Sequence, residues 1–387
     1  WLDRLWSAID AVVMPLPEGT EIAPCDSLPP ARYAVEAVDA APADADAPTR
    51  DAPPPGGWCR QRPWRATVLK NERLTAASSA RDVRHIELDL SGSELAYAPG
   101  DALAVQPRND ERMTRTLLDA LGVDADSRVR VTRAGDAAFA PSLCEAAESA
   151  GGMRTLDLFR DCLDVFGVPR RPFFALLSHF ATDEAQREKL AEFGSPKGAS
   201  DLRDYASRPR RTIAEVLIDF HSARPPLEYL CDMIPPLRQR YFSIASAPDA
   251  HAGAVHLCVA VVRYKTLMHA PRLGVCSNYL ARVAPAGAAP ADHVGVWIRQ
   301  GCLRLPRDPR APMLMVGPGT GVAPFRAFVQ HRAALDAGAP TGGPASPPSA
   351  TLFFGCRRAD EDFLYAAEWV RAAPSTPSRP LTGERTA

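Results

Sequence analysis

Residues 313–325 read Met-Leu-Met-Val-Gly-Pro-Gly-Thr-Gly-Val-Ala-Pro-Phe. The first four residues are apolar and predict a strand. The glycine-rich stretch from Gly317 to Gly321, which contains Gly319 and Thr320, predicts a turn, and a helix is expected from Val322. Glycines let the backbone approach a phosphate closely, and a helix N-terminus presents free N–H groups to it. The stretch therefore indicates a nucleotide-binding turn, with a ligand-free strand–helix turn as the alternative.

This turn differs from the dehydrogenase pattern G-x-G-x-x-G, because its third glycine, Gly321, comes one residue early. The next predicted strand, residues 351–354, is followed by Gly355-Cys356-Arg357, so no acidic residue stands there to bind a ribose 2′-hydroxyl. Cys356 is interpreted either as a neighbour of a reactive ring or as a small core residue. The sequence thus predicts the start of an α/β nucleotide-binding unit of another type.

A second motif, Arg240-Tyr241-Phe242-Ser243-Ile244-Ala245-Ser246, opens a predicted strand. Its cation, aromatic rings and hydroxyl are the groups that hold a diphosphate, cover a flat ring and hydrogen-bond the polar edge of that ring. The alternative is an edge strand whose aromatic residues belong to the core. Taken alone, this motif favours the edge strand.

A third motif, Gly274-Val275-Cys276-Ser277, opens an apolar helix and is a second helix N-terminus of the anion-binding type, unless Ser277 is a simple N-cap. The Arg208-Pro209-Arg210-Arg211 turn is interpreted either as a nucleotide clamp or as a solvated basic turn. Two diphosphate-type sites and an aromatic ring cover together predict two dinucleotides. That combination is typical of hydride exchange between a nicotinamide and a flavin.

The composition excludes several other classes of protein. The chain has 387 residues with 45 Lys and Arg against 46 Asp and Glu, a net charge of −1, which argues against a nucleic-acid partner and against a polybasic membrane protein. The longest nearly apolar stretch, residues 257–262, is too short to span a bilayer. No secretory leader opens the chain, so secretion is not expected.

The nine cysteines are scattered and form no C-x-x-C pair, so we expect neither a disulfide framework nor a metal site. Free thiols in a reducing compartment predict a cytoplasmic protein.

Periodicity predicts a β-rich unit interrupted by helices and followed by a β-α-β unit. The expected strands are 64–70, 83–90, 102–106, 240–245, 255–263, 294–299, 313–316 and 351–354. The expected helices are 109–121, several within 155–220, 322–337 and 361–370. Thr212 and Glu215 have the spacing of a capping box.

The three motifs, together with Phe354-Gly355-Cys356-Arg357, occur in the same order in the diflavin reductases, and residues 58–370 resemble that family. Within it, Phe242 and the stretches 168–174 and 208–213 are similar to the branch that serves cytosolic iron–sulfur cluster assembly. The resemblance implies a ferredoxin-reductase-type antiparallel β-barrel that binds FAD, with a helical insertion, followed by an α/β domain that binds NADPH. It also implies electron transfer through FMN to an iron–sulfur acceptor resembling anamorsin.

The resemblance implies a role for each matching residue. Ser243 and Cys356 are expected to act in hydride transfer, Ser243 near flavin N5 and Cys356 beside the nicotinamide. The residues expected to contact FAD are Arg210, Arg240, Tyr241, Phe242, Ser243, Gly274, Val275, Cys276 and Ser277. The residues expected to contact NADPH are Gly317, Gly319, Thr320, Gly321 and Arg357.

We expect five segments. Residues 1–14 are expected to be the exit of a flavodoxin-like domain, and residues 15–57 a linker rich in Pro, Ala and Asp. The FAD-binding barrel is expected at 58–305, with a helical insertion at about 109–220, followed by an incomplete NADP-binding domain at 306–371 and a disordered tail at 372–387. The pattern lacks an FMN domain, the later residues that read the NADPH 2′-phosphate, and the C-terminal aromatic. The chain is therefore expected to be an FAD/NADPH portion truncated at both ends. Two alternatives remain: an FAD-holding scaffold without NADPH turnover, and a flavoprotein of the sulfite reductase or methionine synthase reductase type.

Overall fold

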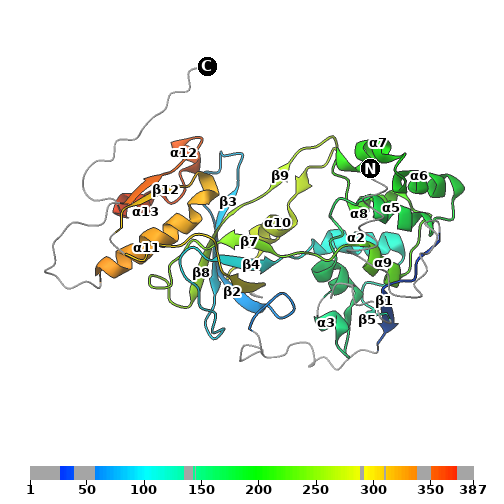
Figure 1. The fold of residues 1–387 in the computed structure, drawn as a ribbon, viewed down its shortest axis with the longest axis horizontal. Helices are drawn as coiled ribbons and strands as arrows, with labels where there is room; N and C mark the ends of the chain where they lie inside the picture. Colours follow the sequence, from blue (N-terminus) through cyan, green and yellow to red (C-terminus); the bar gives the residue numbers. More distant parts are fainter. Residues whose placement is uncertain are drawn as a thin grey trace, which may run out of the picture.

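The computed structural model describes residues 27–38, 57–134, 143, 145–287, 292–308, 311–337 and 350–372. The segment expected at 1–14, most of the expected linker and all but the first residue of the expected tail lie outside these ranges. Figure 1 shows the described part as three regions in a row, with a sheet between a helical region and a smaller α/β region.

The central sheet has six strands in the order β7-β4-β11-β2-β3-β8, and every neighbouring pair is antiparallel. The strands are β2 (Trp64–Arg73), β3 (Val83–Asp89), β4 (Ala102–Gln106), β7 (Arg240–Ser243), β8 (Ala254–Ala260) and β11 (His293–Arg299). All six predicted strands of this region are present, because alternate residues face a core that includes Ile86, Leu88 and Leu103.

The sheet curls so that its edge strands meet, but it does not close into a fully hydrogen-bonded barrel. The segment that follows β7 meets β8 at a single bridge between Ile244 and Leu257, and Ala245 N donates to His256 O at 2.8 Å. The expected ferredoxin-reductase-type fold class is thus confirmed, but its antiparallel sheet is not a closed barrel. Helix α10 (Val275–Arg282) packs into the same core through Tyr279 and Leu280.

The helical region lies between β4 and β7 in the chain. Its helices are α2 (Glu111–Leu121), α3 (Glu145–Glu148), α4 (Thr155–Asp157), α5 (Arg171–Ser178), α6 (Glu184–Gly194), α7 (Ala199–Leu202), α8 (Ile213–Asp219) and α9 (Leu227–Met233), with π-helical turns at Leu158–Cys162 and Arg203–Ser207. The predicted capping box is present, since Thr212 and Glu215 bond reciprocally. These helices share one core around Phe159 and Phe174.

The expected linker contains a strand, which the sequence analysis missed. Strand β1 (Tyr33–Ala37) pairs with β5 (Arg128–Arg133), which also pairs with β6 (Met153–Arg154). Tyr33 is buried in the helical core, and the Arg32 guanidinium forms an ion pair with Asp232. The alternation in Tyr-Ala-Val-Glu-Ala is too short to stand out beside the proline-rich residues around it.

The α/β region begins with β12 (Met313–Val316), a 3-10 turn at Gly319–Val322 and α11 (Ala323–Ala337). Strand β13 (Ala350–Phe353) runs parallel to β12, as the prediction of a β-α-β unit requires. The helix predicted over 361–370 is wrong, because two helices are present, α12 (Ala359–Asp362) and α13 (Ala366–Ala372). They are separated where Leu364 and Tyr365 turn into the core, with Tyr365 in the left-handed region at φ 58°.

Candidate functional site

Strand β7 presents its side chains on alternating faces. Phe242 is half-buried against the core of the central sheet, whereas Tyr241 lies on the other face beneath the guanidinium of Arg299, 4.6 Å from the ring centroid. Arg240 is exposed, and its Nη1 donates to the carbonyl of Arg238 at 2.8 Å. A flat ring on this strand would therefore meet an aromatic face next to a positive charge.

The N-terminus of α10 lies beside this strand. Burial raises the pKa of the Cys276 thiol to about 12. Cys276 belongs to the same core against which Phe242 packs, so the second and third motifs share one core. Ser277 Oγ accepts from Val262 N at 3.0 Å and donates to Gly274 O at 3.2 Å. Its hydroxyl therefore holds the turn in place, while no side chain of the described residues caps the first N–H groups of α10.

The basic turn at 208–211 is tied to the strand that leads into α10. Arg272, in β10 (Arg272–Leu273), donates to Glu215 Oε1 at 2.8 Å and to Pro209 O at 3.4 Å. Arg210 is exposed and adopts the left-handed region at φ 57°, which is unusual for a residue with a side chain. These contacts bring the basic turn and the Gly274 turn together, which the linear sequence does not show.

The turn at Gly317–Gly321 is built on close backbone contacts. A Cβ on Gly317 would lie 2.8 Å from Phe325 and 2.9 Å from Gly321 O. Gly319 has a positive φ of 55°, and its N–H donates to Gly355 O at 2.9 Å. The turn is therefore held against the segment after β13 and leads directly into the 15-residue helix α11.

Cys356 and Arg357 follow Gly355 and are both exposed. Partial burial, followed by the charge of Asp362, raises the pKa of the Cys356 thiol, so this cysteine stays protonated at neutral pH. Arg357 N donates to the Asp362 carboxylate at 3.1 Å. The structure therefore places Cys356 beside the Gly317–Gly321 turn as a neutral thiol, not as a buried core residue.

A cavity of about 540 Å³ lies between this turn and the edge of the central sheet. Gly319 and Thr320 line one side, and Val262, whose N–H bonds Ser277, lines the other. The cavity thus joins the turn at 317–321 with the segment that anchors α10. Its volume lies within the range of small-molecule sites.

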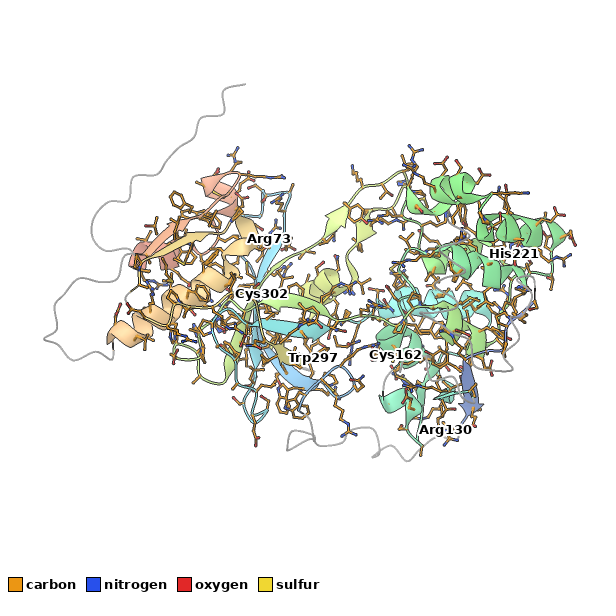
Figure 2. The ribbon with its side chains drawn as sticks, in the orientation of Figure 1. Arg73, Arg130, Cys162, His221, Trp297 and Cys302 are labelled. Atoms are coloured by element: carbon orange, nitrogen blue, oxygen red, sulfur yellow. The ribbon has the colours of Figure 1, made fainter. Side chains whose placement is uncertain are left out.

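Two arginines of this cavity were missed by the sequence analysis. Arg81 and Arg263, the latter in β9 (Arg263–Tyr264), line the cavity, and no described residue pairs with either guanidinium. The loop of Arg81 is held by Arg73, whose Nη2 donates to the carbonyls of Ser79 and Arg81 at 2.8 and 3.0 Å. Figure 2 shows Arg73 where the central sheet meets the α/β region. Nothing in the sequence marks Arg81, because its neighbours form an ordinary polar loop.

The residues present fit two dinucleotides. The cavity offers two guanidiniums that no described residue pairs with, beside a glycine turn in which Gly317 has no room for a side chain. On the flavin side, Arg272 Nη2 is buried without a hydrogen-bond partner among the described residues, two residues before Gly274. An unsatisfied buried donor next to an uncapped helix N-terminus is suited to an anionic group.

One further group, His85, Glu87 and His256, has ligand-type atoms within 4.8 Å of one another in the described part of the chain. Arg326 Nη1 lies 3.3 Å from His256 Nδ1, and because arginine only donates, His256 Nδ1 accepts and its Nε2 carries the proton. That nitrogen faces Glu87 and is not free to ligate a metal. The group is therefore a hydrogen-bonded network rather than a metal site.

Two family profiles match the chain. The FAD binding domain matches residues 58–279, and the oxidoreductase NAD-binding domain matches residues 315–382. Among the described residues, no helix has the length and apolar character needed to cross a membrane.

Curated relatives carry the name NADPH-dependent diflavin oxidoreductase 1. The Xenopus laevis protein is 39% identical over 384 residues, which is 95% of this chain and 60% of that protein. The Bos taurus protein is 38% identical over 373 residues, again 95% of this chain and 60% of that protein. The Arabidopsis thaliana protein is 37% identical over 309 residues, or 78% of this chain and 47% of that protein. The chain thus spans three-fifths or less of the length of these relatives.

Proposed function

Because this chain belongs to the family of proteins with this FAD binding domain and resembles the diflavin oxidoreductases, we propose that it is an oxidoreductase that transfers hydride from NADPH to FAD. One observation carries this proposal: Ala245, two residues after Ser243, packs in the same buried cluster as Val322 and Ala323, which follow the nucleotide-binding turn. The predicted flavin strand and the predicted NADPH turn therefore meet at one junction. Positioning the nicotinamide ring against the flavin ring is the main contribution of a protein to hydride transfer between them.

On the flavin side, bound FAD would supply the hydride acceptor. Phe242 would cover its ring from the half-buried face of β7, and the exposed hydroxyl of Ser243, at the end of that strand, would donate a hydrogen bond to the ring. Arg240, Arg210 and the uncapped N-terminus of α10 would hold its diphosphate.

On the NADPH side, the Gly317–Gly321 turn would hold the diphosphate through backbone N–H groups, with Arg81 and Arg263 supplying positive charge across the cavity. Cys356, a neutral thiol beside the turn, would contact the nicotinamide. A thiol that keeps its proton does not compete as a nucleophile.

We also propose the wider route that the resemblance implies. Electrons would pass through FMN, held elsewhere in the whole protein, to an anamorsin-like iron–sulfur protein in the cytoplasm. The similarity of residues 168–174 and 208–213 to that branch supports this route. Mixing the NADPH-reduced chain with a separate FMN domain and an iron–sulfur acceptor tests it, since an acceptor that stays oxidised contradicts the route.

An absorption spectrum of the purified chain, before and after anaerobic NADPH, tests the proposed reaction. We expect a flavin spectrum that bleaches. A flavin spectrum that persists would favour an FAD-holding scaffold without turnover, and a folded chain that cannot be loaded with FAD would contradict the flavin assignment.

Replacing Ser243 by alanine is expected to slow flavin reduction by roughly tenfold to a hundredfold, because the variant loses a hydrogen bond that acts during transfer. FAD affinity should change by less than about threefold, since Ser243 is one contact among several. Anaerobic stopped-flow reduction and an FAD titration measure the two effects. An unchanged reduction rate would exclude this role for Ser243.

Replacing Arg81 by alanine is expected to raise KM for NADPH by roughly fivefold while leaving kcat nearly unchanged, because an exposed guanidinium strengthens ground-state binding of an anion. The effect should shrink in high salt. Arg112→Ala, an exposed arginine on α2 in the helical region, is the matched control. Equal KM values for the two variants would contradict the assignment of Arg81 to the NADPH site.

A further inference from the structure

Arg326 is a buried arginine at the junction of α11, the segment after β7 and strand β8. It lies on α11 with 5% of its side chain exposed, and its Nη1 donates to Ala245 O at 2.6 Å. The same nitrogen donates to His256 Nδ1 at 3.3 Å. The guanidinium therefore joins α11 to the segment after β7 and to strand β8.

The positive charge of Arg326 is paired with a carboxylate and lies over an aromatic ring. Nε and Nη2 donate to the two oxygens of Glu368 at 2.7 and 2.9 Å, a bidentate pair. The guanidinium also lies over the ring of Tyr365, 4.5 Å from the centroid. Tyr365 in turn bonds His85 at 3.0 Å, and His85 bonds Glu87 at 2.9 Å. A planar group with this many fixed partners has one orientation.

Two more residues of α11 contact the same segment. Ala247 N donates to Gln330 Oε1 at 3.1 Å, and His331 Nδ1 is paired with the Asp249 carboxylate at 2.5 Å. Helix α11 therefore lies along residues 245–249, and residues 245 and 246 are the end of the second motif. At its own N-terminus, α11 follows directly on the Gly319–Val322 turn.

We infer that Arg326 is a positioning residue: it fixes the nucleotide-binding turn relative to strand β7, and so sets the approach of the nicotinamide to the flavin. This inference rests on the proposed function. The connection from the nucleotide-binding turn to β7 through Arg326 is short. Arg326 is only about one helical turn from the nucleotide-binding turn, and it donates to the carbonyl of Ala245, two residues from Ser243. A displacement of about 1 Å between two reacting groups can cost on the order of a hundredfold in rate.

The test compares Arg326→Met with Arg332→Met in the full chain loaded with FAD. Arg332 lies on the same helix, is 7% exposed, and donates to Ala311 O at 2.6 Å within the α/β region. Both variants remove one buried arginine from α11, but only the first removes the contact with Ala245. We expect Arg326→Met to slow hydride transfer at saturating NADPH by roughly tenfold to a hundredfold relative to Arg332→Met, with equal FAD content.

Hydrogen exchange at the Ala247 amide gives a second readout that does not depend on turnover. This N–H is protected by Gln330 of α11, so weaker docking exposes it to solvent. We expect faster exchange in Arg326→Met than in Arg332→Met, and partial recovery in Arg326→Lys, which can still reach one carbonyl. If Arg326→Met does not fold, Glu368→Gln provides the same comparison with a smaller expected effect.

The possible outcomes separate the two proposals. Equal exchange at Ala247 in the two methionine variants overturns the positioning role, whatever the rates are. A wild-type chain that binds FAD but is not reduced by NADPH contradicts the proposed function, whereas faster exchange in Arg326→Met would still support the anchoring of α11. A reducible wild type with unchanged rate and exchange in Arg326→Met overturns the inference alone.

Discussion

Replacing Gly317 by alanine is expected to lower the affinity for NADPH by roughly a hundredfold, because the turn must open to admit the new methyl group. The Cβ would meet Phe325 at 2.8 Å, Gly321 O at 2.9 Å and Val322 Cα at 3.0 Å. Two of these three atoms belong to the backbone, so no rotamer change relieves the contacts. The displaced backbone would carry its N–H groups away from the diphosphate.

Equilibrium binding of NADP⁺ to the FAD-loaded chain measures this loss, and the flavin absorbance reports whether FAD stays bound. Gly151→Ala in the helical region is the control, because its Cβ meets no atom of the described residues within 4 Å. We expect the Gly317 variant to retain FAD, since β7 and α10 do not contain this turn. NADP⁺ binding equal to that of the control would show that the turn is not the nucleotide site.

Lowering the pH from 7.5 to 5.0 is expected to destabilise the junction between the central sheet and the α/β region. Burial, the neighbouring His251 and His85, and the charge of Arg326 together lower the pKa of His256 to about 2. Burial, with Arg326 next, also lowers the pKa of His85. His256 therefore stays neutral in the folded chain while the unfolded chain takes up protons below about pH 6.5, and His85 is harder to protonate in the folded chain than in the unfolded one.

The free energy of unfolding is therefore highest above about pH 6.5 and falls as the pH drops below it, because only the unfolded chain binds a proton at His256. At pH 5.0 the protonation of His256 in the unfolded chain costs about 2 kcal/mol of stability, and His85 acts in the same direction. Urea unfolding at several pH values measures this slope, and His256→Gln should flatten it because glutamine does not titrate. A wild-type stability that is unchanged between pH 7.5 and 5.0 would contradict the buried neutral state of His256.

The parts of the fold predicted correctly are those determined by local sequence. The strand at 313–316, the glycine turn and the helix after it follow one another within a single stretch, and each has its own residue signature. The capping box of Thr212 and Glu215 needs only a spacing of three residues. Alternation also predicted strands such as β3, whose one face is buried in the core.

The failures occur where a distant partner decides the local structure. Strand β1 forms because β5, almost a hundred residues later, pairs with it. The expected helix over 361–370 is interrupted because Tyr365 turns inward to bond His85, which is 280 residues away in the sequence. Propensity within a short window contains no information about such partners.

By itself, the sequence of this protein determined the family, the order of its motifs and the residue types at each predicted phosphate site, because these depend on neighbours along the chain. Only the tertiary structure brought Arg81 and Arg263 to the nucleotide turn, joined Arg272 to the basic turn, and placed Arg326 against Ala245. The physical reason is that burial and charge pairing depend on distance in space. Contacts between residues far apart in the chain have no periodic or compositional trace in the sequence.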